Sequence, residues 1–244
     1  MKYKKPNKGY RQPKKAAELR GATSTAEKPK GVSTSLDNNL SAIEHTFAGN
    51  LDFIVRPFRF GPGQVRMALV FLETLTDKQT LSDFVLEPLH ILCFQEQKSV
   101  KIPSRIIEIL PSALKLEEEG KWETLEEKIV TGHALLFIDG YDRALVMEAR
   151  KWKERAISEP QTETAVVGPR EGFVESLITN VSMLRRRLRT PNLVMEAIPV
   201  GTTSNTNVAI CYLKGVAEEK LVEQVRRRVE NIDVEAMYSV NLVS

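Results

Sequence analysis

Cysteine is scarce in this 244-residue sequence, which contains only Cys93 and Cys211, far apart and inside apolar runs. Two such cysteines do not make a disulfide framework, so the sequence predicts two buried thiols in a reducing compartment. The lysine-rich N-terminus has no apolar core behind it, which does not fit a secretory signal. Runs of roughly 18 apolar residues, which could span a bilayer, are also lacking. The sequence as it stands predicts a soluble body, and it is compatible with one part of a longer protein.

Residues that carry catalytic or metal chemistry are equally sparse. The three histidines, His45, His90 and His133, are scattered without metal-ligand spacing. The sequence contains no His-Glu-x-x-His motif, no phosphate-binding loop and no Gly-x-Ser-x-Gly nucleophile elbow. We therefore expect no enzyme activity, no catalytic residues, no metal site and no cofactor.

Positive charge is concentrated at the N-terminus. Ten lysines and arginines lie in residues 1–31 against two glutamates, which leaves 25 basic and 30 acidic residues in the remainder. This composition predicts a disordered basic tail over residues 1–46. The tail is either simply solvated or an arm that touches anionic lipid or nucleic acid. Since the remainder is acidic and the tail has only Tyr3 and Tyr10 for base stacking, we expect no nucleic-acid partner.

Residues 47–157 have the element order of a small α/β lobe. Gly61-Pro62-Gly63 is a strong turn signal between two apolar runs, and Pro57 places the first run at a sheet edge or a bulge. A longer helical pattern follows, which Pro88 is expected to kink or divide. The predicted strands are Asp52–Phe60, Val65–Leu72, Ala134–Asp139 and Arg143–Ala149, and the predicted helices are Gln79–Phe94, Ser104–Leu110 and Leu125–Thr131.

Residues 158–244 predict a second α/β lobe with the order βαββαβ, typical of a split-βαβ sheet covered by helices. The fold class is therefore α/β, with two small lobes that each hold a mixed β-sheet and packed helices. In the last helix, Leu221, Val225, Val229 and Ile232 are expected to form the buried stripe. The predicted strands are Thr164–Val167, Leu193–Pro199, Asn207–Leu213 and Met237–Val243, and the predicted helices are Glu171–Leu188 and Val216–Ile232.

The first helix of the second lobe admits two interpretations. Its expected apolar stripe runs from Phe173 to Leu188 at helical spacing. In one interpretation Arg170 and Glu171 cap the helix, and the arginines of residues 185–189 form a solvated end that matches the helix dipole. In the other, the backbone N–H groups of Gly172 and Phe173, together with Arg170, form an anion pocket at the helix start. An unpaired polar group along the stripe would cost about 1–3 kcal/mol, so those groups must find partners.

The same segment carries a resemblance to a known family. The run Gly-Pro-Arg-Glu-Gly-Phe at residues 168–173, continued by Glu175-Ser176-Leu177, Thr179-Asn180 and Arg185-Arg186-Arg187-Leu188, is similar to the signature of the GerA spore-germination family. The resemblance covers roughly residues 50–244. Since A subunits of this family continue into a membrane domain, it implies an isolated N-terminal domain followed by a membrane part in the full-length protein.

The resemblance implies a receptor role rather than catalysis. Such A subunits act with a transporter-like B subunit and a lipoprotein C subunit at the spore inner membrane, where nutrients are sensed and ions released. It further implies a homo-oligomeric ion channel with this domain on the cytoplasmic side, and a small nutrient is a possible ligand. A signal would pass as a shift of one lobe against the other. The residues expected to contact a ligand or another subunit are Arg170, Glu171, Gly172, Glu175, Asn180, Arg185 and Arg187.

Two other functions remain open at this point. A stage V sporulation paralogue would share the motifs and have an assembly or channel role only. A soluble regulator that binds a small molecule between the two lobes is the alternative from a different class.

Overall fold

The computed structural model describes residues 29–61, 63–95, 106, 110, 115–151 and 172–235. The first lobe contains a five-stranded sheet in the order β1-β2-β4-β5-β3, in which every neighbouring pair is antiparallel. Its strands are β1 (Phe53–Phe60), β2 (Val65–Leu72), β3 (Leu116–Glu119), β4 (Ala134–Ile138) and β5 (Ala144–Met147). The α/β class is thus confirmed, although this sheet is antiparallel rather than mixed; β3 was not predicted.

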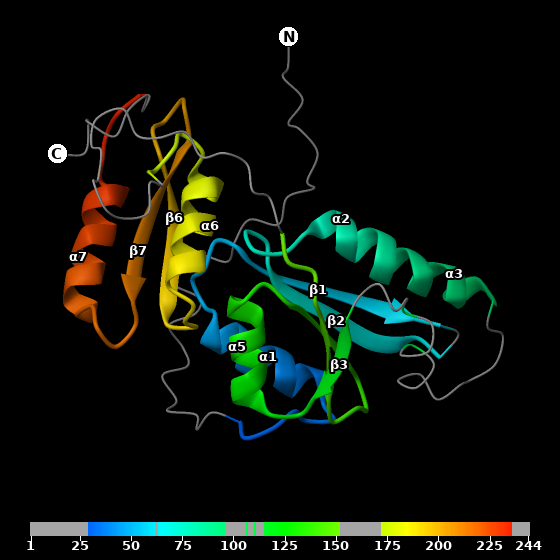
Figure 1. The fold of residues 1–244 in the computed structure, drawn as a ribbon. Helices are drawn as coiled ribbons and strands as arrows, with labels where there is room; N and C mark the ends of the chain where they lie inside the picture. Colours follow the sequence, from blue (N-terminus) through cyan, green and yellow to red (C-terminus); the bar gives the residue numbers. More distant parts are fainter. Residues whose placement is uncertain are drawn as a thin grey trace, which may run out of the picture.

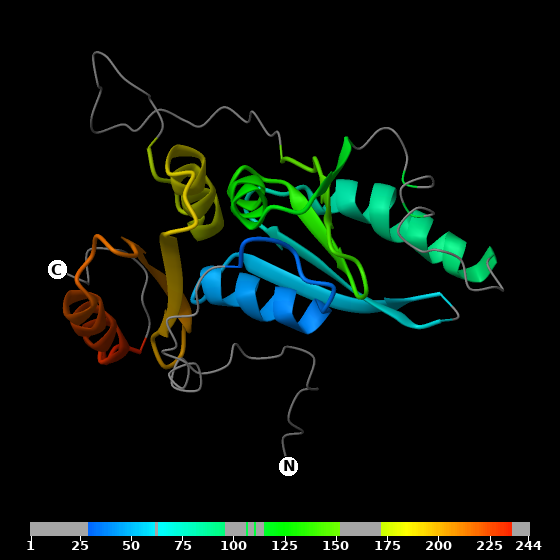
Figure 2. The same ribbon diagram turned by 90° about the horizontal axis from the view of Figure 1, so that it is seen from below.

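Helices cover both faces of this sheet, as Figure 2 shows. On one face, α1 (Leu36–Thr46) and α5 (Trp122–Val130) pack against alternate residues of β2 such as Val70. On the other face, α2 (Lys78–Leu81), a π-helical turn η1 (Ser82–Leu86) and α3 (Glu87–Gln95) pack against Leu69 and its neighbours. Burial on both sides explains why β2 and β4 are almost entirely apolar.

Two proline predictions are confirmed. Pro57 lies in β1, which is an edge strand, so its missing N–H removes no hydrogen bond from the sheet interior. The long helix is divided just before Pro88, where η1 separates α2 from α3. Proline has no N–H to donate and its ring clashes with the preceding turn, and a π-helical turn relieves both problems.

The predicted tail of residues 1–46 is wrong in its last part, because residues 36–46 form α1. Ser35 caps this helix by accepting a hydrogen bond from the N–H of Asn38. Leu36, Ile43 and Phe47 are buried against the sheet. This helix is amphipathic, and only a few apolar residues hold it against the sheet. The polar residues between them make the segment polar on average, so its overall composition does not indicate a helix. Residues 1–28 lie outside the described part of the chain.

The second lobe contains α6 (Leu177–Arg187), β6 (Leu193–Val200), β7 (Thr206–Leu213) and α7 (Glu219–Glu230). Strands β6 and β7 pair antiparallel over their full length (Figure 1). These elements are the inner four of the predicted βαββαβ order. The two outer predicted strands and the expected lobe boundary near residue 157 lie outside the described residues.

The two faces of the β6–β7 sheet have different partners. One face packs against α7 through Ile198, Val200 and Val229. The opposite face packs against α6 and also against Leu51 of the first lobe. Since one sheet face is shared between α6 and the first lobe, α6 lies beside the place where the two lobes meet.

Two sequence-based burial predictions are wrong. In α7, Leu221 and Val225 are 55% and 37% exposed, whereas Val222 and Val229 are buried. Arg226, which pairs with Glu196 on β6, lies on the same side of the helix as these two buried valines. Cys211 is exposed rather than buried. The side chain of Cys93 lies outside the described residues.

Candidate functional site

Helix α6 begins at Leu177, not at Glu171 as predicted. Ser176 caps it by accepting a hydrogen bond from the N–H of Thr179. The side chain of Asn180 accepts from the N–H of Val174 at 2.8 Å and donates to its carbonyl at 2.7 Å. This double contact holds the preceding segment outside the helix, because it uses the backbone groups that a further helical turn would need.

The anion pocket predicted at the helix start is therefore not formed there. Gly172 and Phe173 precede the first helical residue by five and four positions, and Phe173 is 68% exposed. Their N–H groups do not belong to the N-terminus of α6, so the helix dipole does not act on them. Arg170 and Glu171 lie outside the described residues.

Arg185, near the end of α6, is the most buried arginine described, with 1% of its surface exposed. Its Nε and Nη2 donate to the two carboxylate oxygens of Asp52 at 3.2 and 2.8 Å. Nη1 donates to the carbonyl of Leu193 at 2.8 Å, and Nη2 donates also to Oδ1 of Asn50 at 2.6 Å. The prediction of a solvated arginine terminus is thus wrong for Arg185, although its neighbours Arg186 and Arg187 are exposed.

Asp52 is fully buried and belongs to the first lobe, directly before β1. Besides Arg185, its Oδ2 accepts a hydrogen bond from the hydroxyl of Thr74 at 2.5 Å. A buried carboxylate or guanidinium is stable only when it is paired and its remaining hydrogen bonds are satisfied. Here the bidentate pair and its polar neighbours meet that condition. We call Asn50, Asp52, Thr74 and Arg185 the lobe joint.

The backbone also crosses between the lobes at this joint. The N–H of Leu51 donates to the carbonyl of Met195 at 2.8 Å, and the N–H of Met195 donates to Oδ1 of Asn50 at 2.9 Å. The segment Asn50–Leu51 of the first lobe therefore bonds to strand β6 of the second. Asn50 serves both connections, since the same oxygen accepts from Arg185 and from Met195.

A second connection lies on the α7 side of the sheet. The Lys214 ammonium donates to the carbonyl of Thr46, at the C-terminal end of α1, at 3.2 Å. Burial lowers the pKa of Lys214 from its ordinary value, while the negative end of the α1 dipole favours its charge. Gly49 lies beside Glu196 with φ of +83°, a conformation that side chains other than glycine rarely adopt. The chain can therefore turn from α1 toward the joint in a narrow space.

Glu196 on β6 forms the second carboxylate cluster. It accepts from the hydroxyl of Tyr212 at 2.6 Å and from Nε and Nη2 of Arg226 at 2.9 and 2.8 Å. Burial alone would raise the pKa of Glu196, but the hydrogen bonds from Arg226 and Tyr212 outweigh it and lower that pKa. Burial and the hydrogen bond to Glu196 raise the pKa of Tyr212. We call Glu196, Tyr212, Glu223 and Arg226 the Glu196 network.

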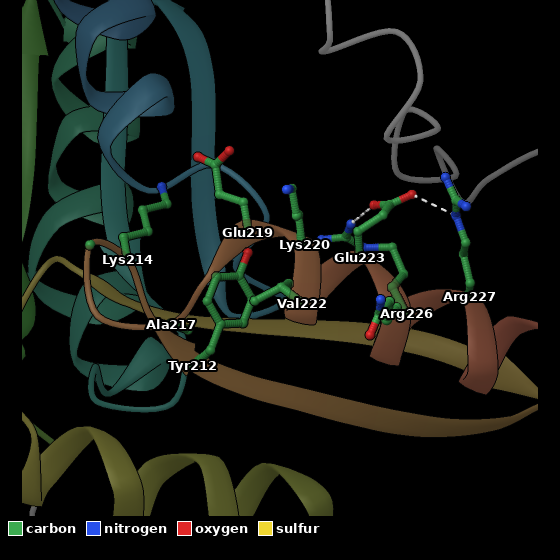
Figure 3. A pocket seen from close by; sticks show the side chains of 11 residues that line it. Tyr212, Lys214, Ala217, Glu219, Lys220, Val222, Glu223, Arg226 and Arg227 are labelled. Carbon is green, nitrogen blue, oxygen red and sulfur yellow. Dashed lines mark hydrogen bonds and ion pairs between the residues drawn. The ribbon is translucent and has the colours of Figure 1, made fainter.

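A surface pocket of about 800 Å³ adjoins this network. Figure 3 shows Lys214 and Glu219 at one end of it and Glu223 between Arg226 and Arg227 at the other. Glu223 is paired with Arg226 and Arg227, and no described pocket-lining residue is a serine, histidine or cysteine nucleophile. Within the described ranges no cluster of histidine, cysteine and carboxylate side chains is suited to a metal ion. The pocket is thus an open surface hollow without a catalytic or metal-binding group among its described residues.

Of the other predicted contact residues, Glu175 and Arg187 are exposed, Gly172 is partly exposed and Asn180 bonds within its own lobe. Among the predicted contact residues that the structure describes, Arg185 alone belongs to the lobe joint. Sequence reasoning missed its partners Asn50, Asp52 and Thr74. The available signal was an aspartate placed directly before an apolar strand, but its partner lies 133 positions away in the chain.

Comparisons with known proteins identify the family. Residues 41–244 match the family described as Bacillus/Clostridium GerA spore germination protein. The chain belongs to this family. The resemblance expected over roughly residues 50–244 is thereby confirmed, and the matched range includes the lobe joint.

Individual relatives agree with this assignment. Spore germination protein KA of Bacillus subtilis is 33% identical over 215 residues, which cover 86% of this chain and 39% of that protein. Stage V sporulation protein AF of the same organism is 33% identical over 138 residues, or 55% of this chain and 28% of that protein. The chain thus spans well under half the length of these relatives. Among the described residues, no helix is long and apolar enough to cross a bilayer.

A solved structure matches the fold. It is the N-terminal domain of the A subunit of the Bacillus megaterium spore germinant receptor GerK3, with a TM-score of 0.66 and 25% sequence identity. The match covers 83% of this chain and 74% of that one. The arrangement of a five-stranded and a smaller sheet is therefore that of a GerA-family N-terminal domain.

Proposed function

We propose that this chain is the N-terminal domain of a spore germinant receptor A subunit, on the cytoplasmic side of the spore inner membrane. There it takes part in nutrient sensing, receptor assembly and signal transmission to a membrane ion channel that triggers germination. Its partners are the transporter-like B subunit, the lipoprotein C subunit and further A subunits. The match to the N-terminal domain of the GerK3 A subunit carries this proposal. We assign the domain no catalytic step.

The lobe joint is the element through which we propose that the signal passes. The charges of Asp52 and Arg185 are buried and fully bonded across the two lobes. A shift of one lobe against the other must rearrange these bonds together, because a half-broken pair leaves a buried charge without a partner. Packed interfaces of this kind move between discrete arrangements rather than deform continuously. The joint therefore favours two defined lobe orientations over a gradual range.

Germination of spores that carry joint variants tests this role. Asp52→Asn and the milder Thr74→Val are introduced into the full-length receptor, with Asp37→Asn as the control, since Asp37 forms an exposed pair with Arg66. We expect slower nutrient-triggered loss of optical density for both joint variants at unchanged receptor levels in immunoblots. Normal germination at normal levels in both variants contradicts transmission through the joint.

Direct nutrient sensing by this domain is a separate part of the proposal. Isothermal titration and thermal unfolding of the chain with amino acids, sugars and nucleosides test it. A nutrient that raises the melting temperature supports direct sensing, because a ligand that binds only the folded state stabilises that state. No response to any of the nutrients means that the domain serves assembly and transmission alone.

The sequence-predicted contacts with a ligand or another subunit remain proposals. Arg170→Ala and Glu171→Ala in the full-length receptor test the pair that precedes the described part of the second lobe. Loss of germination or of receptor assembly supports the contact. Unchanged germination, assembly and folding would show that the proposed contact is wrong.

A sporulation paralogue is the second candidate, supported by the 33% identity to stage V sporulation protein AF. Its role is in assembly or in a channel, without nutrient sensing. Deletion of the gene separates the two functions: spores that lose their response to one nutrient favour the receptor, and spores that respond to all nutrients favour the paralogue. A soluble small-molecule regulator, the third alternative, requires that the full-length chain lacks a membrane part.

A further inference from the structure

Basic and apolar side chains gather at one end of the second lobe. Helix α6 ends there, and so do the start of β6, the end of β7 and the start of α7, which form the lower end of this lobe in Figure 1. The N–H of Lys214 donates to the carbonyl of Asn192 at 2.9 Å, so the α6–β6 and β7–α7 connections lie against each other. We call this surface the basic end; its members are Arg186, Leu188, Arg189, Val216, Lys220 and Leu221.

The basic end has a local excess of positive charge. Its three exposed basic side chains, Arg186, Arg189 and Lys220, lie at the same end of the lobe as two exposed glutamates at the start of α7, Glu218 and Glu219. Arg186 donates to the carbonyl of Ser182, and Arg189 donates to the carbonyl of Arg186, so the described bonds of these two guanidinium groups leave their charge without neutralisation. The folded part of the chain is acidic in total, so this excess is specific to one surface.

Exposed apolar side chains lie among these charges. Leu188 is 42% exposed, Val216 is 79% exposed and Leu221 is 55% exposed. Apolar groups bordered by arginine and lysine are the pattern of surfaces that sit in the headgroup region of a bilayer. There the apolar groups enter the acyl boundary and the cations meet lipid phosphates. No described member of the basic end is aromatic, which leaves nucleic-acid bases without a stacking partner.

We propose that the basic end of the second lobe binds the surface of an anionic lipid bilayer. This inference goes beyond the proposed receptor function, because it fixes which face of the domain meets the membrane. Arg186 and Arg189 contact the phosphates, and Leu188 and Val216 insert between the headgroups. The opposite end of the lobe, where α7 ends, faces away from the bilayer.

Vesicle sedimentation with the complete 244-residue chain tests the proposal. Vesicles of equal parts phosphatidylglycerol and phosphatidylcholine are compared with pure phosphatidylcholine at about 0.15 M salt, where charges act over roughly 8 Å. The variant is Arg186→Gln with Arg189→Gln. The matched control is Arg227→Gln with Arg228→Gln, which removes the same charge from the end of α7. The N-terminal lysines are present in all proteins, so they do not affect the comparison.

We expect the variant to lose about tenfold or more in affinity for the anionic vesicles, since each arginine near such a surface contributes substantially. The control is expected to bind like the unaltered chain. Equal losses in both proteins, or no loss in either, overturn the proposal, because binding would then follow total charge or the N-terminal residues. Circular dichroism and thermal unfolding verify that both variants fold.

The apolar contribution is tested separately with Leu188→Asn combined with Val216→Asn. Both positions are exposed, so these substitutions are expected to cost little folding stability. We expect this variant to bind the vesicles several-fold more weakly, and we expect the difference from the unaltered chain to persist at high salt. Unchanged binding overturns the insertion of these side chains. If duplex DNA binds the chain more tightly than the anionic vesicles and the Arg186/Arg189 variant loses that binding, the partner is nucleic acid and the lipid proposal is wrong.

Discussion

Two arginines of the second lobe each hold a carboxylate through two nitrogen atoms, but in different surroundings. The side chains of Arg185 and Asp52 are 1% and 0% exposed, and they join the two lobes. Those of Arg226 and Glu196 are 18% and 17% exposed, and they join a helix to the strand beneath it in the same lobe. The first pair has no access to water if it is broken, whereas the second can be partly rehydrated.

This difference predicts unequal consequences for the same chemical change. Removing one partner of a buried pair costs about 3–5 kcal/mol because the other charge stays buried, and an exposed pair is worth about 0–1 kcal/mol. The Glu196 network lies between these limits. We therefore expect the buried pair to contribute more to the contact between the lobes than the Glu196 network contributes to the packing of α7.

The largest effect is expected for Arg185→Met, which leaves the Asp52 carboxylate buried without its cation. We expect the free energy of unfolding to fall by about 3–5 kcal/mol, measured by urea unfolding with circular dichroism. The control is Arg186→Met, at an exposed neighbouring position, where a change below about 0.5 kcal/mol is expected. Equal effects at the two positions would mean that burial of Arg185 does not matter to stability.

A smaller effect is expected for Glu196→Gln at neutral pH. The amide retains part of the hydrogen bonding to Tyr212 and Arg226 but loses the charge, so we expect a loss of about 1–2 kcal/mol. Tyr212→Phe is the companion variant, since it removes one hydrogen bond and keeps the ion pair. A loss as large as that of Arg185→Met would contradict the ranking of the two pairs.

The same network predicts a pH dependence. The pKa of Glu196 is lowered in the folded state from its ordinary value of 4.5. The ionised carboxylate therefore stabilises the fold above that value, and this stabilisation is lost as the pH falls through the folded-state pKa. We expect the stability difference between the unaltered chain and Glu196→Gln to shrink below about pH 4.5 in urea unfolding. A difference that stays constant down to pH 3 rules out this linkage.

Asn180→Ala is expected to act locally. It removes both hydrogen bonds to Val174, at a cost of about 1 kcal/mol. Hydrogen exchange measured by mass spectrometry should show faster exchange of residues 172–176 with little change at the lobe joint. Ser176→Ala at the helix cap provides the comparison for a purely capping effect. Faster exchange at Asp52 and its neighbours would instead couple Asn180 to the joint.

The smallest effect is expected for Lys214→Met, which removes one ammonium from the C-terminal end of α1. Such contacts contribute about 0.3–1 kcal/mol to stability. Part of this loss is offset, because the partly buried ammonium loses hydration on folding and methionine carries no charge to dehydrate. Urea unfolding at low and high salt measures the change in the free energy of unfolding. A loss above about 2 kcal/mol would contradict a contribution from the helix dipole alone.

Local patterns of the chain made much of the fold predictable. The β1–β2 hairpin follows from two apolar runs around Gly61 and Gly63, and the division of the long helix follows from Pro88. The order of α6, β6, β7 and α7 follows from clear changes of period. The start of α6 was misplaced, because the side-chain contact of Asn180 with Val174 competes with the helical pattern.

The candidate site could not be predicted in the same way. Arg185 was one of several arginines at a helix end, and spacing along the sequence did not distinguish it from Arg186 or Arg187. Its burial depends on Asp52, which lies 133 positions earlier and carries no motif. Likewise, the spacing of the apolar residues in α7 did not show that Arg226 pairs with Glu196 on the covered side of the helix or that Leu221 and Val225 are exposed.

By itself, the sequence determined the α/β class, most of the elements and the family, because propensity, periodicity and a contiguous signature are properties of neighbouring residues. Only the tertiary structure decided which charge is buried and which face of each helix is covered. Those outcomes depend on desolvation and on partners distant in the chain, and a single charged residue in a row of similar ones carries no local sign of either.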